Sequence, residues 1–483
     1  MKKAAVFLLP VILGLGLSAF ALVLGRAAVA RASASIFYVA PGGVCGGSVP
    51  NCYATVQAAV DAASPGDEIR VAAGTYTDFD VRPRSDVTTT GVVTQSVYLT
   101  KSLIIRGGYS SDFSAWNPAA DVTTLDAQGK GRVLYITGAI SPTIEGLYLT
   151  GGDASGLGGY AYYGSFDAGG GVYVLTATVT LLNNQIYSNT AHYGGGVFLS
   201  HSAGRLSGNQ ISDNQVSTGG AGVFLYKGEP TLESNQVFSN TSDNLGGGVY
   251  IFSTDALLKG NTIRGNSSNT LGGGLDVASS SPTLIGNIFS GNSSKKGGGA
   301  YLWYNRSELT NNVFMDNQAT TNGQGSGLWM GGSSPVLLQN TFSNNTGGDG
   351  SGIMITDAGS TGTSLVMSNT IVSQHSVGIS VTAGSSANLD GILWYSTPIT
   401  VSQAGSGVSV QHQYQGDPAF APDGYHLTAG SAAINKGVQA GVATDIDGQP
   451  RTNGAPDLGA DEYWPAGVLK NVYLPLIYKN EVP

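Results

Sequence analysis

One acidic side chain, Asp276, stands in a row of residues that is otherwise mostly aromatic. Each member of the row lies two positions after a recurring glycine, and the first seven are Tyr173, Phe198, Phe224, Tyr250, Asp276, Tyr301 and Trp329. A carboxylate placed in this way could serve as a general acid or base on a sugar polymer. Glycoside cleavage needs a second carboxylate or a base within reach, and no residue in register with Asp276 supplies one. Asp276 is therefore a candidate catalytic residue without an evident partner.

The six aromatic residues of this row offer a different chemistry, because aromatic rings stack on the faces of sugar rings. As ligand-binding candidates they would contact a glycan along one outward strand face. The alternative is that the rings stack on one another on the sheet and are shielded by neighbouring loops. We favour the alternative, since an apolar row marks a binding site only where it stays uncovered.

Two further carboxylates, Asp445 and Asp447, lie in an Asp-Ile-Asp-Gly segment and are candidate ligands for calcium. The segment lacks the spacing of an EF-hand, because its glycine is fourth and no glutamate follows at position twelve. A turn that closes the last coil of a repeat is the alternative that we favour. The sequence therefore predicts no cofactor, with calcium at Asp445 and Asp447 as the one exception to test.

The first 34 residues have the pattern of a secretory signal peptide. Lys2 and Lys3 precede an apolar run over residues 4–25, and Ala32-Ser33-Ala34 is a small-x-small cleavage site. An uncleaved membrane anchor is the alternative, since the run approaches spanning length. Cleavage would leave 18 basic and 31 acidic residues, a net charge of −13. An acidic exported chain of this kind has no electrostatic basis for binding nucleic acid.

The chain has two cysteines, Cys45 and Cys52, in a glycine-rich segment on the exported side. Their short spacing and an oxidising compartment favour a local disulfide over two free thiols. No spacing typical of metal ligands accompanies them.

A repeat of about 26 residues positions Asp276 and the aromatic row. A glycine-rich triplet followed by an apolar strand recurs, with its last glycine at positions 171, 196, 222, 248, 274, 299, 327, 352 and 378. The composition agrees with a packed core and many tight turns, because charged residues make up 11% of the chain, hydrophobic residues 41%, and glycine occurs 72 times.

Other residue types keep fixed places within each repeat. Aliphatic residues occupy the first and third positions after the last glycine, which indicates a strand with one buried face. Leucine recurs from Leu181 to Leu337, and asparagine recurs in two columns, from Asn184 to Asn340 and from Asn189 to Asn345. Stacked asparagines can satisfy buried turn backbone, and both Gly and Asn tolerate the positive φ of sharp corners.

These periodicities predict an all-β fold, a right-handed parallel β-helix with three short strands in each coil. An α-helical solenoid is disfavoured by the period of two and by the triple glycines. A short amphipathic helix over residues 55–63 is expected to cover the open end of the first coil.

The same patterns divide the chain into five parts. They are the signal peptide (1–34), an N-terminal cap with irregular first coils (35–152), the regular repeats (153–383), C-terminal coils with a cap or anchor-type segment (384–463), and a tail (464–483). The tail is too short to span a bilayer and contains proline, so no membrane span is expected after signal cleavage.

The region from residue 36 to residue 463 resembles the pectate-lyase-like right-handed β-helix superfamily. Its Gly-Gly-x-apolar elements with Phe-x-x-Asn, at 289–292 and 314–317, are similar to the repeats of polymorphic outer-membrane proteins. The segment from Tyr425 to Ala460 resembles the choice-of-anchor segment of surface β-helix proteins. The resemblance implies an exported β-helix, and it leaves the activity open because this fold carries lyases, hydrolases and adhesins.

Two functions from different classes follow from these observations. We favour a secreted or cell-surface module that binds or adheres without catalysis, with a polysaccharide or another surface as its partner. The alternative is a polysaccharide lyase or glycoside hydrolase that acts on an extracellular polysaccharide. The paired Asp-Asp, Gly-His-Gly and Arg-x-Lys signatures of polygalacturonase-like enzymes are absent from the sequence.

Overall fold

A computed structural model describes residues 34–46, 49–83, 92–160, 166–359, 361–404 and 407–465. The chain from Ser35 onward forms one compact unit, which is the subject of the following sections. The predicted signal peptide, apart from Ala34, and the predicted tail beyond Pro465 lie outside the described residues. No helix within the described ranges has the length and apolar character needed to cross a membrane.

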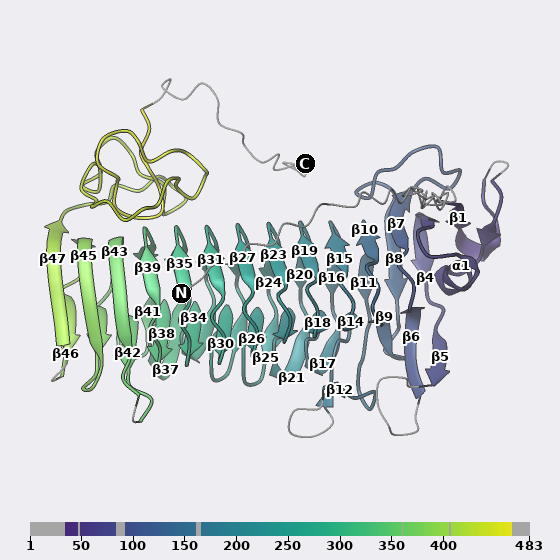
Figure 1. Cartoon of the computed structure of the whole chain (residues 1–483), viewed down its shortest axis with the longest axis horizontal. Coiled ribbons are helices and arrows are strands. Elements are labelled where there is room, and N and C mark those ends of the chain that lie inside the picture. Colours follow the sequence, from purple (N-terminus) through teal and green to yellow (C-terminus); the bar gives the residue numbers. More distant parts are fainter. Residues whose placement is uncertain are drawn as a thin grey trace, which may run out of the picture. The chain divides into compact units, whose positions relative to one another are not determined.

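The unit is a parallel β-helix whose coils stack in sequence order (Figure 1). This confirms the predicted all-β solenoid. Among the described residues the helices are α1 (Val56–Ala62) and the short 3-10 helix η1 (Pro41–Gly43).

Two strands of each regular coil belong to a 25-stranded sheet, which consists of two ladders. The first, ladder A1, contains β1 (Ile36–Val39), β2 (Cys52–Tyr53), β3 (Glu68–Ala72), β7 (Ile104–Tyr109), β10 (Thr143–Glu145), β15 (Thr180–Leu182), β19 (Arg205–Ser207), β23 (Thr231–Glu233), β27 (Leu257–Lys259), β31 (Thr283–Ile285), β35 (Glu308–Thr310) and β39 (Val336–Leu338). The second, ladder A2, contains β4 (Gly74–Tyr76), β8 (Thr123–Asp126), β11 (Tyr148–Thr150), β16 (Gln185–Tyr187), β20 (Gln210–Ser212), β24 (Gln236–Phe238), β28 (Thr262–Arg264), β32 (Ile288–Ser290), β36 (Val313–Met315) and β40 (Thr341–Ser343). The long strands β43 (Ser364–Ser373), β45 (Ser386–Tyr395) and β47 (Gly407–Gln415) extend both ladders, since β43 pairs with β39 and with β40.

The third strand of each coil belongs to the 13-stranded sheet B. Its members are β5 (Asp80–Pro83), β6 (Val92–Leu99), β9 (Arg132–Thr137), β14 (Val172–Leu175), β18 (Val197–Ser200), β22 (Val223–Tyr226), β26 (Val249–Phe252), β30 (Leu275–Ala278), β34 (Ala300–Trp303), β38 (Leu328–Gly331), β42 (Ser351–Thr356), β44 (Val377–Val381) and β46 (Ile399–Gln403). All its pairings are parallel except that between β5 and β6.

Regular coils also carry a fourth, short strand that the sequence periodicity does not predict. These strands form the seven-stranded sheet C, with β17 (Thr190–Tyr193), β21 (Gln215–Gly219), β25 (Thr241–Ser242), β29 (Ser267–Ser268), β33 (Ser293–Lys296), β37 (Gln318–Gln324) and β41 (Thr346–Gly347). A separate antiparallel pair consists of β12 (Gly159–Tyr160) and β13 (Phe166–Asp167).

The glycine triplets allow sheet C to turn into sheet B at close quarters. In the coil that contains β26, Gly246 has a φ of 49° and forms the turn. A Cβ atom on Gly248 would lie 2.5 Å from the carbonyl oxygen of Gly274 in the next coil, so a side chain there would force the coils apart.

The two asparagine columns form the predicted amide ladders inside the corners of the coil. Asn266 is fully buried, and its Nδ2 donates to the carbonyl oxygen of Val237 (2.9 Å) and to Oδ1 of Asn292 (3.0 Å). Its Oδ1 accepts hydrogen bonds from the backbone N–H (3.1 Å) and from Nδ2 (2.9 Å) of Asn240. Each asparagine thus satisfies backbone groups that the corner would otherwise leave unpaired in the interior.

The positive φ expected at these corners lies one residue before each ladder asparagine and not on the asparagine itself. Ser234 (φ 56°), Ser239 (φ 55°) and Asp316 (φ 56°) are examples, each followed by a ladder residue in ordinary conformation. The reason is that the ladder asparagine directs its amide inward, while the left-handed residue makes the bend and directs its side chain outward to solvent.

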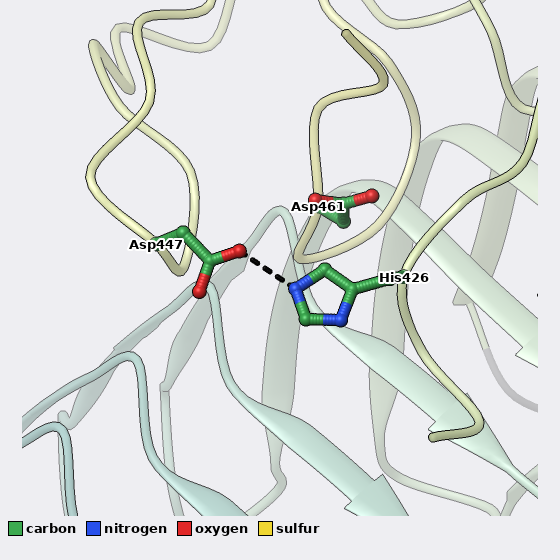
Figure 2. A group of neighbouring side chains, drawn as sticks. All are labelled: His426, Asp447 and Asp461. Carbon is green, nitrogen blue, oxygen red and sulfur yellow. Dashed lines mark hydrogen bonds and ion pairs between the residues drawn. The ribbon is translucent and has the colours of Figure 1, made fainter. Parts of the chain in front are cut away.

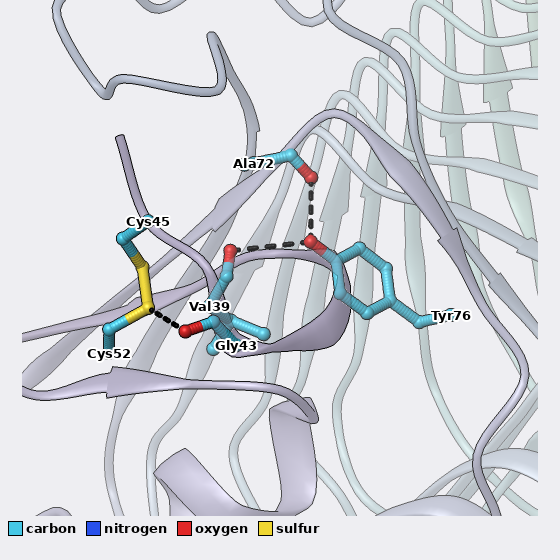
Figure 3. Close-up of a disulfide and its surroundings, with 6 residues drawn as sticks. All are labelled: Val39, Gly43, Cys45, Cys52, Ala72 and Tyr76. Carbon is cyan, nitrogen blue, oxygen red and sulfur yellow. Dashed lines mark hydrogen bonds between the residues drawn. A yellow bond between two sulfur atoms is a disulfide. The ribbon is translucent and has the colours of Figure 1, made fainter. Parts of the chain in front are cut away.

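The N-terminal end of the solenoid is covered as the sequence predicts. Helix α1 begins with the Thr55 hydroxyl accepting the N–H of Ala58 (3.1 Å) and packs Val56, Ala59 and Val60 into the core. The predicted disulfide between Cys45 and Cys52 closes the adjacent loop, with a sulfur of Cys52 lying 3.2 Å from the carbonyl oxygen of Gly43 (Figure 3).

Residues 416–465, called here the C-terminal lobe, fold back over the outer side of the 25-stranded sheet. The Asn311 side chain donates to the carbonyl oxygen of Thr444 (2.7 Å) and accepts from Arg451 (3.1 Å). The Asn369 side chain pairs with the N–H and the carbonyl oxygen of Val438, both at 2.7 Å. The lobe therefore contacts several successive coils along their side.

The outward row of ladder A2 changes character beneath this lobe. Polar residues of the earlier coils give way to mostly apolar ones in the order Gln185, Gln210, Gln236, Thr262, Ile288, Val313, Thr341, Ile371 and Leu393. Ile371 and Leu393 pack with Leu427, Ala433 and Leu458 of the lobe in a separate apolar cluster. Burial of this cluster attaches the lobe to the solenoid.

Removal of one ladder amide is expected to destabilise the solenoid strongly. Replacement of Asn266 by alanine leaves the buried N–H of Asn240 unpaired and removes one of the three acceptors of the Asn240 amide, together with the hydrogen bonds that Asn266 donates. Because each buried unpaired group costs roughly 1–3 kcal/mol, we expect the free energy of unfolding to fall by about 2–4 kcal/mol. Urea-induced unfolding followed by circular dichroism measures this change.

The matched control is Asn269→Ala in the same coil, since Asn269 is exposed. We expect that variant to unfold within about 0.5 kcal/mol of the unmodified protein. Equal effects of the two substitutions would contradict a special role of the ladder.

Candidate functional site

The aromatic row occupies the second position of successive strands of sheet B and points away from the main core. Rings in neighbouring coils stack, with centroid separations of 5.5 Å between Tyr173 and Phe198, 4.8 Å between Phe224 and Tyr250, and 4.4 Å between Tyr301 and Trp329. Tyr135 extends the stack one coil toward the N-terminus, with its ring 4.8 Å from that of Tyr173. The rings thus form a second apolar layer outside the main core.

The segments that lead from sheet C into sheet B cover this layer. Leu245 packs with the rings near Tyr250, and Leu271 packs with those of Tyr301 and Trp329. The six candidate side chains are between 0% and 7% exposed. In this structure the row presents no open face on which a sugar ring could stack.

Asp276 lies in the middle of the covered row, between Tyr250 and Tyr301 in the neighbouring strands. Its exposed fraction is 1%, and neither carboxylate oxygen has a hydrogen-bond partner within the described part of the chain. Desolvation raises the pKa of Asp276 to about 8. A substrate cannot contact this carboxyl group where it lies, and no second carboxylate accompanies it in the row.

The carboxylates of the two candidate calcium ligands have different partners in the lobe. Asp445 is buried, and its carboxylate accepts the backbone N–H groups of Asp447 (3.0 Å), Gln449 (2.7 Å) and Glu462 (3.1 Å). Its oxygens therefore hold the turn together by accepting backbone hydrogen bonds. The turn belongs to the C-terminal lobe and lies beside Asn311 of the solenoid. From the sequence, this turn was expected to close the last coil.

Asp447 instead meets two residues that were not candidates from the sequence, His426 and Asp461 (Figure 2). Nε2 of His426 lies 2.6 Å from Oδ2 of Asp447, and its Nδ1 lies 2.6 Å from Oδ2 of Asp423. The hydrogen bond with Asp447 is the main factor that raises the pKa of His426 to about 9. One ligand atom from each of His426, Asp447 and Asp461 falls within 4.8 Å of the other two.

A groove of about 330 Å³ runs along the edge of the lobe, where it meets the outer face of ladder A2. It crosses several coils, because Met315, Ser343 and Tyr395 belong to one outward row. Its lining residues are Met315, Asp316, Ser343, Asn344, Gln374, Tyr395, Asp417, Pro418, Phe420 and Gly424. The groove thus combines two aromatic rings with carboxylate, amide and hydroxyl groups.

Hydrogen bonds already order two polar side chains of this groove. Nδ2 of Asn344 donates to Oδ1 of Asp316 at 2.6 Å, which aligns the amide and the carboxylate side by side. Across the groove, hydrogen bonding to Asp417 raises the pKa of Tyr395. Asp417 also accepts the N–H of Ala419 (2.8 Å), so its position is set by its own turn.

Sequence reasoning missed His426, Asp461 and the groove for one reason. They depend on contacts between segments that are distant in sequence. His426 and Asp461 meet when separate turns of the lobe fold together. The groove forms when the lobe docks on coils that are about 100 residues away in sequence, as the hydrogen bond between Thr341 and Ala460 illustrates. One signal was available. The outward row of ladder A2 turns apolar at Ile288, which indicates that something covers the coils from there onward.

Substitution of Asp276 by asparagine is expected to remove a pH-dependent loss of stability. The folded-state pKa of about 8 lies above the ordinary value of 3.8, so the folded protein binds this proton more tightly than the unfolded chain. Stability from this group is complete below about pH 4 and is lost as the pH rises toward 8. Thermal unfolding between pH 4 and pH 8 should therefore show a smaller decline for Asp276→Asn than for the unmodified protein.

At pH 8 we expect Asp276→Leu to raise the free energy of unfolding by roughly 1–3 kcal/mol, because an unpaired buried carboxylate is replaced by an apolar group. The exposed Asp243→Asn serves as the control for general charge effects. Parallel pH profiles of Asp276→Asn and the unmodified protein would contradict a buried, partnerless Asp276.

Comparison with known proteins adds the family. The sequence matches the family described as right handed beta helix region over residues 129–314 and 242–391, which together cover more than half of the chain. A solved structure titled "Crystal structure of pectate lyase Pel9A" is similar at 13% sequence identity and a TM-score of 0.44, over 90% of this chain and 97% of that chain. No curated protein matches the sequence. The chain belongs to the right-handed β-helix family.

Proposed function

We propose that this protein is a secreted or cell-surface β-helix that binds carbohydrate without cleaving it. The groove at the edge of the C-terminal lobe is the binding site in this proposal. The observation that carries it is the pairing of accessible aromatic rings with ordered hydrogen-bonding groups in that groove. Sugar-binding sites combine these two features, since rings contact the C–H face of the sugar while carboxylates and amides bind its hydroxyls.

The charge of the groove favours neutral sugars over uronates. Its lining includes the carboxylates of Asp316 and Asp417, and no lysine or arginine is among the lining residues. Two carboxylates repel the acidic groups of a polyuronate, and a lyase acting on such a polymer would need a cation or a basic side chain to oppose that charge.

The length of the groove suits an extended chain of sugars. Met315, Ser343 and Tyr395 lie on coils that span three steps of the outward row. At about 4.8 Å for each step, this row extends over roughly 14 Å. Contacts repeated along a polymer strengthen binding without any single tight subsite.

The buried state of Asp276 supports the non-catalytic part of the proposal. The acid that the sequence singled out is sealed beneath the segments that enter sheet B, and both its oxygens are beyond the reach of a substrate. The disulfide between Cys45 and Cys52 supports export, because such bonds persist in oxidising compartments.

A glycoside hydrolase is the second candidate function, and one observation favours it. Asp316 and Asp417 are two carboxylates that line a single groove, as a hydrolytic mechanism requires. Asp316 is exposed and already accepts a hydrogen bond from the Asn344 amide, an arrangement that suits the binding of sugar hydroxyls. Binding is the better account of this pair.

Replacement of Tyr395 by alanine is expected to weaken binding of a neutral polysaccharide about tenfold, since loss of one stacking ring costs about 1.4 kcal/mol. Affinity electrophoresis with a panel of neutral and acidic polysaccharides measures the change in mobility. Asp316→Asn should weaken binding as well, because a charged acceptor for sugar hydroxyls becomes a neutral amide.

Tyr304→Ala is the matched control, because Tyr304 is 44% exposed and is not among the groove residues. The proposal fails if Tyr395→Ala and Tyr304→Ala bind every polysaccharide equally well. If the protein releases reducing ends from a polysaccharide and Asp316→Asn abolishes this activity, the glycoside-hydrolase function would replace the binding proposal.

A further inference from the structure

The His426, Asp447 and Asp461 side chains come from three separate segments of the lobe and face one another (Figure 2). The geometry points to a binding site for one divalent transition metal of the Zn²⁺ type, with Nε2 of His426 and one oxygen from each aspartate as ligands. The site is independent of the carbohydrate groove, whose lining residues do not include these three.

The imidazole ring is oriented as a metal ligand would be. Nδ1 of His426 is held by Oδ2 of Asp423 at 2.6 Å, and the N–H groups of Tyr425 (3.3 Å) and His426 (3.2 Å) donate to the other oxygen of Asp423. A carboxylate on the far nitrogen selects the tautomer that leaves Nε2 free for a metal, and it increases the basicity of the ligand.

Asp461 supplies an observation that an ordinary ion pair does not explain. It is only 4% exposed, and Oδ2 accepts the N–H of Leu427 at 2.7 Å. Within the described residues, the hydrogen bonds to the Asp461 carboxylate engage only this oxygen, while its backbone carbonyl accepts from Arg451. A buried carboxylate that faces a second carboxylate across an imidazole carries an unfavourable surplus of negative charge, which a dication would neutralise.

The ligand types select the metal. Calcium prefers six to eight oxygen ligands, whereas one imidazole with two carboxylates suits Zn²⁺ and similar borderline ions. A tetrahedral Zn²⁺ with bonds of about 2.1 Å places its ligand atoms roughly 3.4 Å apart. Nε2 of His426 and Oδ2 of Asp447, now 2.6 Å apart, would separate slightly as the metal replaces the proton between them and that proton passes to solvent.

Solvent can reach the ligands from one side. Asp447 lines a cavity of about 360 Å³ between the lobe and the solenoid, together with Glu233 and Lys259. The side chains of His426 and Asp447 remain 29% and 37% exposed. Water can therefore complete the coordination, and the ion can enter without unfolding of the lobe.

A metal at this position would tie together turns of the lobe that are about 35 residues apart in sequence. Because the ion binds the folded lobe and not the unfolded one, it stabilises the folded form by mass action. The expected effect is local. Amide hydrogen exchange should slow in residues 416–465, while exchange in the coils before residue 222 should stay unchanged.

The test uses the full chain, without a histidine tag and freed of metal by a chelator. Titration calorimetry with ZnCl₂ should show about one equivalent bound for each chain, with CaCl₂ and MgCl₂ binding much more weakly. Hydrogen exchange with and without Zn²⁺ locates the effect. Binding of Ca²⁺ in preference to Zn²⁺, or Zn²⁺ protection in the coils before residue 222, would overturn the assignment.

Two variants remove ligands, and one serves as a matched control. His426→Gln and Asp447→Asn should weaken Zn²⁺ binding roughly tenfold or more. His412→Gln is the control, since Nδ1 of His412 also lies 2.7 Å from an aspartate, Asp390, but the pair has no third ligand among the described residues. If His426→Gln fails to fold, Asp447→Asn at its half-exposed position still decides the matter. Unchanged binding in Asp447→Asn, or equal losses in His412→Gln, would refute the site.

Discussion

Backbone at the inner corners of a β-helix must find hydrogen bonds without water, and the asparagine ladders supply them. The amide of Asn266 bonds backbone groups of the preceding coil and an asparagine side chain of each neighbouring coil. This requirement aligns the corner of each coil with the equivalent corner of the next coil. The registered leucines, the glycine turns and the stacked aromatic row all follow from that alignment. Irregular segments such as the C-terminal lobe can be added only on the outer sides of the coils, where they leave the ladders intact.

The sequence predicts the parts of the coil that the asparagine ladders align, because equivalent positions in every repeat have the same surroundings. The inward leucine and asparagine columns, the strand between glycine and corner, the cap helix and the disulfide could all be read from residue types and spacing. Contacts outside the coil could not. Whether Tyr250 is open or covered depends on Leu245 of the turn before it, and the meeting of Asp447 with His426 depends on how the lobe folds. Neither contact recurs in every repeat, so the spacing of residue types in the sequence does not predict it.

The outer aromatic row shows how outward residues can become interior ones. A ring stack on a pleated surface gains from dispersion and from burial, and each covering turn adds apolar contacts to the coil below. Asp276 interrupts this layer at the cost of desolvating a carboxyl group. The candidate binding site is therefore not the covered, regular aromatic row of sheet B. It is the irregular surface where the lobe meets ladder A2.

The attachment of the lobe has a consequence for how such chains can change in length. Its polar contacts reach Asn311, Thr341 and Asn369, which lie in consecutive coils near the C-terminal end. Coils between residues 172 and 222 supply neither these contacts nor the lining of the cavity beside Asp447. Whole repeats could be duplicated or lost there during evolution while the lobe, its groove and its cluster of His and Asp side chains kept the same surroundings. The number of coils, and with it the length of the solenoid, could then vary between related chains while the lobe keeps its place on the C-terminal coils.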